Sequence, residues 1–193
     1  AAVDLATIDF ADTVASQLVS MLRNQGGGRF ADAAVRVTPG FWPLAFAAAD
    51  FNRDGRKDLA VAGSDSSLLI LNGTGDGFFA IGPFYTVADD FNGIGGVAAA
   101  DLDGDLDIDL ALVHPHLSVL LNNGNGTFGP APAQTLPRDA DSVALVAADL
   151  DGDDDMDLAL ADKDTRDAVS IYRNDGSAVF TAVGAPAARM SEA

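Results

Sequence analysis

The segment DLDGDLDIDLALV at residues 101–113 contains the pattern that organises the whole chain. It is an acidic loop followed by Asp-Leu-Ala and an apolar run typical of a buried strand. Two further stretches repeat it, DFNRDGRKDLAVAG at 50–63 and DLDGDDDMDLALA at 149–161. A fourth Asp-Leu-Ala starts at Asp4, and the intervals between the triplets are 54, 51 and 48 residues. The chain is therefore built from repeats of about 50 residues.

Each triplet is followed by a second apolar run that ends in a Gly- or Asn-rich turn and then Phe, which predicts a hairpin. The four versions are VSMLRNQGGGRF (19–30), LLILNGTGDGFF (68–79), LSVLLNNGNGTF (117–128) and VSIYRNDGSAVF (169–180). Runs of small residues precede three triplets: PLAFAAAD (43–50), GGVAAAD (95–101) and VALVAAD (143–149). One repeat thus predicts four strands with an acidic loop after the first, which is the unit of a propeller blade.

The predicted fold is all-β, with β-propeller-type blades of four antiparallel strands. Three blades are complete, and the N-terminal one is incomplete because Asp4 already belongs to its second strand. Small residues suit an innermost strand, where blades converge. We expect a single domain over 1–193, with blade-like units at about 1–42, 43–92, 93–140 and 141–183 and a tail at 184–193.

Composition excludes several classes of function. The chain of 193 residues has no cysteine, and its 11 basic and 29 acidic residues give a net charge of −18. Disulfides are excluded, and the charge argues against nucleic acid or an anionic membrane surface as partner. No apolar run approaches a membrane span, so we expect no membrane insertion. The sequence has no Gly-x-Ser-x-Gly elbow, phosphate loop or cysteine nucleophile, and we predict that it is not an enzyme.

The acidic loops are the candidate metal sites. They hold fourteen of the 28 Asp residues, and such crowding is unfavourable unless a cation lies among the carboxylates. Oxygen donors without His or Cys favour Ca²⁺. Loop positions 1, 3, 5 and 9 carry oxygen side chains, and position 7 supplies a backbone carbonyl in the similar first part of an EF-hand loop. The candidate ligands are Asp50, Asn52, Asp54, Arg56 and Asp58; Asp101, Asp103, Asp105, Asp107 and Asp109; and Asp149, Asp151, Asp153, Asp155 and Asp157.

The alternative is that these loops are solvated Asp/Gly turns, but three copies in register favour calcium. Gly55 stands at the sixth position, where a sharp turn often needs a positive φ, whereas the equivalents are Leu106 and Asp154. Geometry therefore favours the first loop, while the number of carboxylates favours the second and third.

These motifs resemble the FG-GAP/VCBS repeat family of integrin-α-like calcium-binding β-propellers, over about residues 2 to 182. The resemblance implies up to three calcium ions, one in each loop, that stabilise the blades. It also implies a secreted or cell-surface location and a propeller face that binds proteins or carbohydrates.

The expected function is an extracellular, calcium-stabilised, non-catalytic repeat module for protein binding, adhesion or surface assembly. The alternatives are a lectin-like carbohydrate-binding propeller and an accessory domain of a larger secreted enzyme. Unpaired edges and half-exposed blade faces predict self-association. Trp42 is either a sugar-stacking platform or a filler between blades, the second being favoured, and His114-Pro115-His116 is interpreted as a turn.

Overall fold

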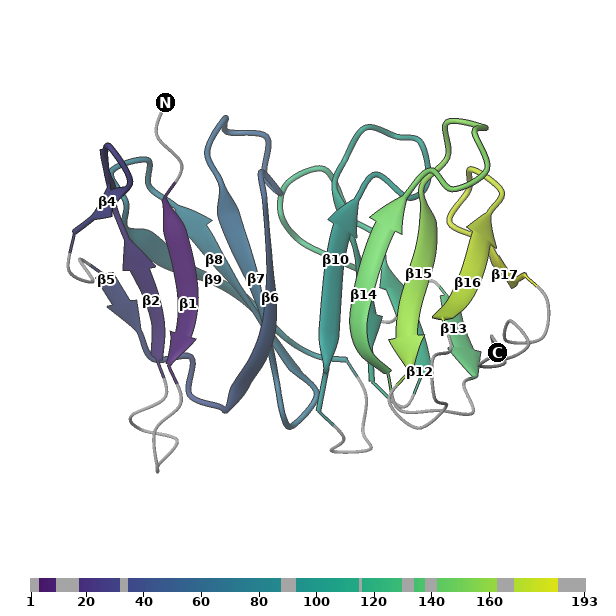
Figure 1. Ribbon diagram of the computed structural model, residues 1–193, viewed down its shortest axis with the longest axis horizontal. Coiled ribbons are helices and arrows are strands. Elements are labelled where there is room, and N and C mark those ends of the chain that lie inside the picture. Colours follow the sequence, from purple (N-terminus) through teal and green to yellow (C-terminus); the bar gives the residue numbers. More distant parts are fainter. Residues whose placement is uncertain are drawn as a thin grey trace, which may run out of the picture.

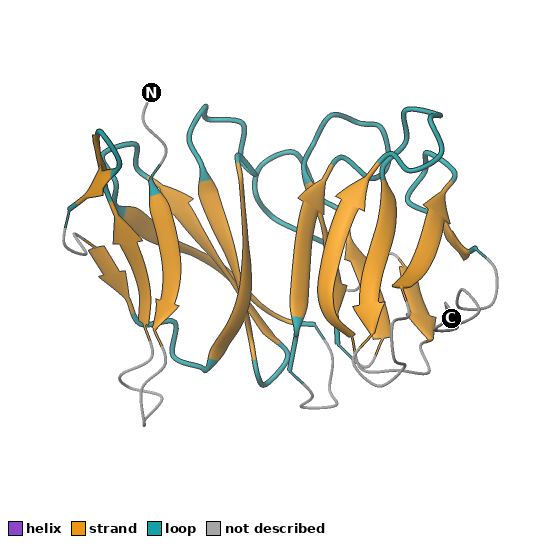
Figure 2. Ribbon diagram, viewed as in Figure 1, coloured by secondary structure: helices purple, strands orange, loops and turns teal. Residues whose placement is uncertain are grey.

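The computed structural model describes residues 4–9, 18–31, 35–87, 93–114, 116–129, 134–137, 142–162 and 169–183. All regular structure in these residues is β-strand, and none of them is helical (Figure 2). The all-β prediction is confirmed.

Three four-stranded antiparallel sheets follow one another along the chain, each with its strands in sequence order (Figure 1). The acidic loop lies between the first and second strand of each sheet, as the repeat predicted. The strands are β6 (Pro43–Ala49), β7 (Asp58–Gly63), β8 (Ser67–Gly73) and β9 (Phe79–Thr86); β10 (Gly96–Ala100), β11 (Asp109–Val113), β12 (His116–Leu120) and β13 (Gln134–Pro137); and β14 (Ser142–Ala148), β15 (Asp157–Asp162), β16 (Val169–Asn174) and β17 (Phe180–Ala182).

The N-terminal repeat forms a sheet of three strands, in the order β1-β2-β5, and a separate two-stranded hairpin of β3 and β4. Its first described strand, β1, starts directly after Asp4 and pairs with β2 as β7 pairs with β8, so β1 corresponds to the second strand of the other repeats. The bounds are β1 (Leu5–Asp9), β2 (Leu18–Leu22), β3 (Asn24–Gly26), β4 (Arg29–Phe30) and β5 (Val35–Val37).

Strand register beside the acidic loop is the same in the three four-stranded sheets. The triplet Asp pairs with the last Ala of the small-residue strand, because the loop between them always has the same length. The pairs are Asp58 with Ala49, Asp109 with Ala100, and Asp157 with Ala148. Since side chains alternate between the two faces of a strand, equal register places equivalent residues on equivalent faces.

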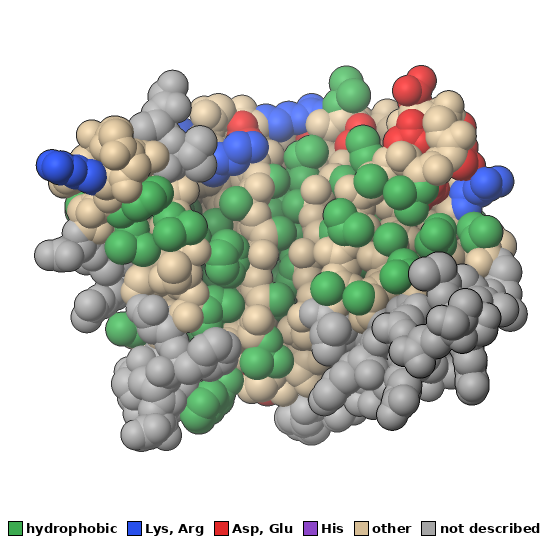
Figure 3. Space-filling model, viewed as in Figure 1, with side chains coloured by type: hydrophobic (Ala, Val, Ile, Leu, Met, Phe, Trp, Pro, Cys, Tyr) green, Lys and Arg blue, Asp and Glu red, His purple; other side chains and the backbone are tan. Residues whose placement is uncertain are grey.

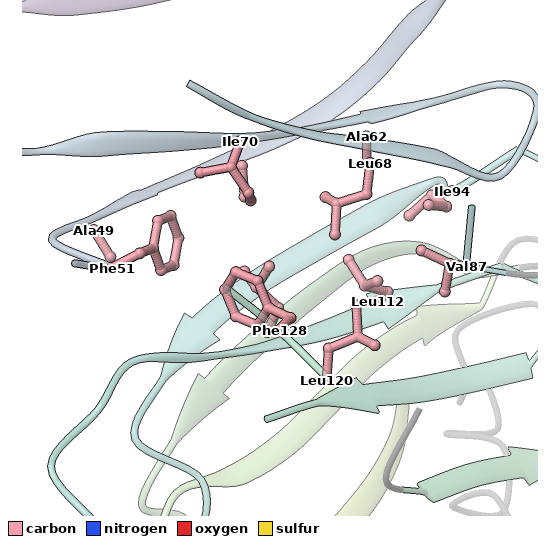
Figure 4. Packing of buried hydrophobic residues seen from close by; sticks show 12 residues of the cluster. Ala49, Phe51, Ala62, Leu68, Ile70, Val87, Ile94, Leu112, Leu120 and Phe128 are labelled. Atoms are coloured by element: carbon pink, nitrogen blue, oxygen red, sulfur yellow. The ribbon is translucent and has the colours of Figure 1, made fainter. Parts of the chain in front are cut away.

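Neighbouring sheets pack face to face, and their first strands β6, β10 and β14 lie next to one another. Between the first two four-stranded sheets, Phe51 meets Phe128 edge to face with ring centroids 5.7 Å apart (Figure 4). Leu68, Ile70 and Leu112 are among the other buried residues of this layer. Equivalent residues of the second and third sheets form the next layer, so one packing arrangement is used twice.

Two single-residue predictions have different outcomes. The turn at His114 is confirmed, because its N–H donates to the carbonyl of His116 between β11 and β12; Pro115 lies outside the described residues. The interpretation of Trp42 as a filler between blades was wrong. Its neighbour Phe41 is the buried ring, packed between β7 and the N-terminal sheet, while Trp42 remains exposed.

Candidate metal centre

The three acidic loops, 50–57, 101–108 and 149–156, lie at the same edge of the molecule, at the top of Figures 1 and 2. In Figure 3 acidic side chains gather along this edge, most densely near the loop between β14 and β15. The first two loops touch, because the guanidinium of Arg53 pairs with Asp107 and also donates to the carbonyl of Asp105 at 3.2 Å.

The ninth-position Asp of each loop is buried and fastens the loop to the sheet. One carboxylate oxygen accepts a hydrogen bond from the backbone N–H at loop position 2, and the other accepts one from the end of the third strand. These N–H groups belong to Phe51 and Gly73 for Asp58 (3.0 and 2.7 Å), Leu102 and Asn122 for Asp109 (2.9 and 2.8 Å), and Leu150 and Asn174 for Asp157 (3.0 and 2.9 Å). A carboxylate has about four acceptor positions, so each of these groups can also meet a cation.

Asp4 shows that the N-terminal repeat keeps part of this arrangement. Its Oδ1 accepts a hydrogen bond of 2.8 Å from the backbone N–H of Asn24. Asn24 therefore occupies the position held by Gly73, Asn122 and Asn174 in the other repeats.

The first-position carboxylates turn inward because backbone N–H groups of their own loop donate to them. Asp50 accepts from Asp54 and Gly55 at 3.1 and 2.8 Å. In the other loops the donors are Gly104 and Leu106 for Asp101 (2.9 and 3.0 Å) and Gly152 and Asp154 for Asp149 (2.7 and 3.3 Å). Fifth-position carboxylates accept from the N–H at position 7, at 2.7 to 3.0 Å.

The loop backbone is left-handed at positions 4 and 6 in all three copies. At position 6, φ is +83° for Gly55, +71° for Leu106 and +73° for Asp154. At position 4 the residues are Arg53, Gly104 and Gly152, with φ of +59°, +79° and +85°. Each loop thus has one glycine and one residue with a side chain in this region, and each bears about the same strain. The expectation that geometry favours the first loop was wrong. Position 4 also needs a positive φ, and there the second and third loops have glycine while the first has Arg53.

The structure gathers carboxylates in the second and third loops. Oxygen atoms of Asp101, Asp103 and Asp109 lie within 4.8 Å of one another, and so do those of Asp149, Asp151 and Asp153. Among the described residues, no such group of three forms in the first loop, whose third position is the amide Asn52. The larger number of carboxylates in the second and third loops, seen in the sequence, is thus also gathered in space. These all-oxygen, strongly anionic sets fit a hard divalent cation.

The seventh-position side chains point away from the loop, toward the glycine turn of the hairpin. A Cβ added at Gly124 would lie 2.7 Å from Asp107 Oδ2, and one at Gly176 would lie 2.6 Å from Asp155 Oδ2. The same contact joins Arg56 to Gly75, at 2.8 Å from Nε. These side chains thus contact the hairpin, and the backbone carbonyls of Arg56, Asp107 and Asp155 remain predicted ligands. Glycine is required in these turns by the backbone, whose φ is +84° at Gly75, +78° at Gly124 and +82° at Gly176.

Two kinds of contact at the acidic loops were not predicted from the sequence. Arg173, on β16, pairs with the third-loop Asp151 at 2.7 Å, and no spacing rule connects these residues. The amides of Asn122 and Asn174 each donate at 2.8 Å to the loop carbonyl of the preceding sheet, on Phe51 and Leu102 respectively. The Asn that stands six residues before the hairpin Phe was the available signal for the second kind of contact.

The FG-GAP-like repeat family matches residues 3–61, 50–112 and 114–160, and this chain belongs to that family. The family prediction made from the loop motifs is thereby confirmed. A search of curated proteins found no match. Within the described residues, no helix has the length and apolar character needed to cross a membrane.

Among the carboxyl groups of the described residues, Asp109 has the most strongly shifted pKa. Burial, with the charges of Asp103 and Asp105 adding to it, raises the pKa of Asp109 from 3.8 to about 6, although backbone hydrogen bonds from Asn122 and Leu102 oppose the shift. Burial also raises the pKa of Asp103. Both shifts arise where a bound cation would compensate the negative charge.

We expect the metal-free protein to become more stable as the pH falls from 7 to 5. The raised pKa means that folded Asp109 holds a proton between pH 6 and 3.8 that the unfolded chain has released, so protonation favours the fold in this window. Thermal unfolding in excess chelator, followed by circular dichroism, measures the change. The melting temperature should rise by several degrees, and saturating calcium should abolish the rise.

The variant Asp109→Asn is the control, since it cannot titrate at this position. Its melting temperature should be lower overall because an amide cannot accept both backbone hydrogen bonds, but its slope with pH should be flatter. An equal slope in both proteins would contradict the assignment of the titration to Asp109.

Proposed function

We propose that this chain is a calcium-stabilised, non-catalytic repeat module that works outside the cell, where it binds a partner or builds a surface assembly. In this proposal each four-stranded sheet is a propeller-type blade and the N-terminal sheet is an incomplete one. The observation that carries the proposal is the gathering of three carboxylates, within 4.8 Å, in the equivalent loops of two successive repeats, at loop positions 1, 3 and 9 in one and 1, 3 and 5 in the next.

Calcium suits these loops better than other cations for reasons of chemistry. The donors are carboxylate, amide and carbonyl oxygens, which hard cations prefer. The loops are short and partly exposed, and the flexible coordination of Ca²⁺ suits such loops better than the strict octahedron of Mg²⁺. Up to three ions would bind, one in each loop. Millimolar calcium outside cells would fill even weak sites.

The role of the ion would be structural. The first-, third- and fifth-position side chains would hold it, and the buried ninth-position Asp would connect it to the sheet. A cation there compensates the charges that otherwise repel within the loop. The proposed absence of catalysis rests on the sequence, which lacks nucleophile and phosphate-binding motifs.

Carbohydrate binding is the second candidate, and one observation favours it. Trp42 is exposed beside the buried Phe41, and an exposed indole ring is a common platform for the apolar face of a sugar. Equivalent aromatic residues do not recur in the other repeats, so this candidate ranks below the first.

Calcium titration by calorimetry on chelator-stripped protein tests the proposal. We expect at least two bound ions per chain. Asp103→Asn and Asp153→Asn should each weaken binding at one site about tenfold or more, because each removes a ligand charge but keeps the acceptor for the loop N–H.

The matched control is Asp154→Asn, which removes the same charge from the third loop. Asp154 is exposed at the left-handed sixth position, and Asn tolerates that backbone well. Its affinity for calcium should stay close to that of the parent. The proposal fails if calcium produces no heat, or if all three variants lose affinity equally.

A further inference from the structure

The sheets β6–β9 and β10–β13, here called the inner sheets, each contact the sheet that follows with the same four positions of their second and third strands. In sheet β6–β9 these residues are Ala60, Ala62, Leu68 and Ile70, and in sheet β10–β13 they are Ala111, Val113, Leu117 and Val119. All eight have at most 1% of their surface exposed. Register assigns Ala159, Ala161, Val169 and Ile171 to these positions in sheet β14–β17.

In the last sheet this face is uncovered. Val169 is 50% exposed and Ile171 37% exposed, and no strand among the described residues packs on them. Leu150 belongs to the same surface, since it follows the first loop position as Phe51 and Leu102 do. Those two side chains are buried between sheets, whereas Leu150 is 47% exposed. We call Leu150, Ala159, Ala161, Val169 and Ile171 the C-terminal face.

The N-terminal sheet exposes the complementary surface. Its Leu5, Leu22 and Phe30 occupy the positions that Leu110, Leu120 and Phe128, or Leu158, Tyr172 and Phe180, use to contact the preceding sheet. Leu5 is 46% exposed and Phe30 44%, while Phe128 and Phe180 are buried. We call Leu5, Leu22, Asn24 and Phe30 the N-terminal face. Figure 3 shows hydrophobic side chains exposed at both ends of the molecule.

Asn24 extends the equivalence to hydrogen bonding. It holds the position of Asn122 and Asn174, as its bond to Asp4 shows. In those two repeats the Asn amide donates to the loop carbonyl of the preceding sheet at 2.8 Å. The corresponding carbonyl on the C-terminal face is that of Leu150.

We propose that the C-terminal face of one copy of this chain binds the N-terminal face of a second copy, so that the stack of sheets continues from molecule to molecule. The Asn24 amide of the second copy donates to the Leu150 carbonyl of the first. This inference rests on the assembly role proposed above and specifies its surface. The internal layers supply the template, because a second copy presents the residues that repeat the contact already made twice within the chain.

Such a contact is heterologous, since each copy uses a different face. Successive copies then form a closed ring or an open fibre, whereas a symmetric pair would use one face twice. The high negative charge of each copy opposes this association, and calcium in the loops would weaken the repulsion.

Light scattering coupled to size exclusion tests the contact in calcium with the 193-residue chain. The parent should exceed the mass of one chain. Ile171→Lys and Phe30→Lys each damage one face and should each weaken association by about 30-fold or more. Ile81→Lys is the control, because Ile81 is 73% exposed on an inner sheet outside both faces and should leave association unchanged.

Mixing the two damaged variants gives the decisive result. Ile171→Lys retains its N-terminal face and Phe30→Lys its C-terminal face, so a 1:1 mixture should form a dimer and nothing larger. A symmetric contact would instead leave one variant self-associating and the mixture unchanged. Either that pattern or a monomeric parent overturns the inference, the second outcome meaning that something other than this chain covers the faces.

Two parallel measurements distinguish a loss of association from unfolding of a variant and from a loss of calcium binding. Circular dichroism and melting temperature establish that each variant is folded. Calcium calorimetry on the same samples shows whether the metal proposal holds, since a monomer that still binds calcium contradicts only the association.

Discussion

Chelation of calcium is expected to lower the melting temperature of this chain by about 10–20 °C. An ion that binds only the folded state at a hundred times its Kd contributes about 2.7 kcal/mol, so two filled loops contribute about 5 kcal/mol. For a domain of this size, 1 kcal/mol corresponds to roughly 2–4 °C. Thermal unfolding by circular dichroism, in excess calcium and again in excess EGTA, measures the difference.

Loop variants show whether the loops cause this effect. The double variant Asp103→Asn and Asp153→Asn should retain about half of the difference between calcium and EGTA or less, because a site that binds tenfold more weakly contributes only about 1.4 kcal/mol at the same calcium concentration. Asp154→Asn should retain nearly all of it. Identical melting in calcium and EGTA would mean that the loops are ordinary turns held by their internal hydrogen bonds.

Replacement of Leu102 by Ala is expected to cost about 2–5 kcal/mol, the range for a buried leucine. Leu102 is fully buried between the second and third four-stranded sheets, beside Ala178 and Phe180. Removal of the Leu102 side chain leaves a cavity, and the described buried residues of this layer include no methionine that could adapt to fill it. Urea or thermal unfolding in saturating calcium measures the cost.

Leu150→Ala provides a control at the same loop position of the next repeat. The chemical change is the same, but the side chain is half exposed, so the cost should stay below about 1 kcal/mol when the protein is dilute. Equal costs for the two variants would contradict the assigned packing. At concentrations where copies associate, Leu150→Ala should in addition weaken association.

The sequence was sufficient to predict the sheets and the loop positions. Asp58, Asp109 and Asp157 are followed by alternating apolar residues, and this local pattern determines strand, register and loop length together. The position of the N-terminal sheet followed from Asp4 by the same rule. Repetition made each assignment more secure, because an error would have had to occur four times in register.

Contacts between side chains distant in sequence could not be predicted in this way. Arg53 crosses from its loop to the loop of the next repeat, and Arg173 reaches Asp151 from another strand of its own repeat. The first contact depends on how the sheets stack and the second on how β16 lies beside the loop, and local spacing encodes neither. The burial of Phe41 in place of Trp42 could not be predicted either, because both residues precede β6 and no strand alternation determines which ring faces the core.

The ion pair of Arg53 with Asp107 makes neighbouring loops interdependent. Arg53 is a left-handed residue of the first loop, yet its side chain is held by the second. A divalent ion bound in the second loop, as proposed above, would repel this guanidinium and so would weaken the contact between the two loops. The first two loops therefore should not bind calcium independently. The calcium affinity of one loop should depend on whether the other loop is occupied.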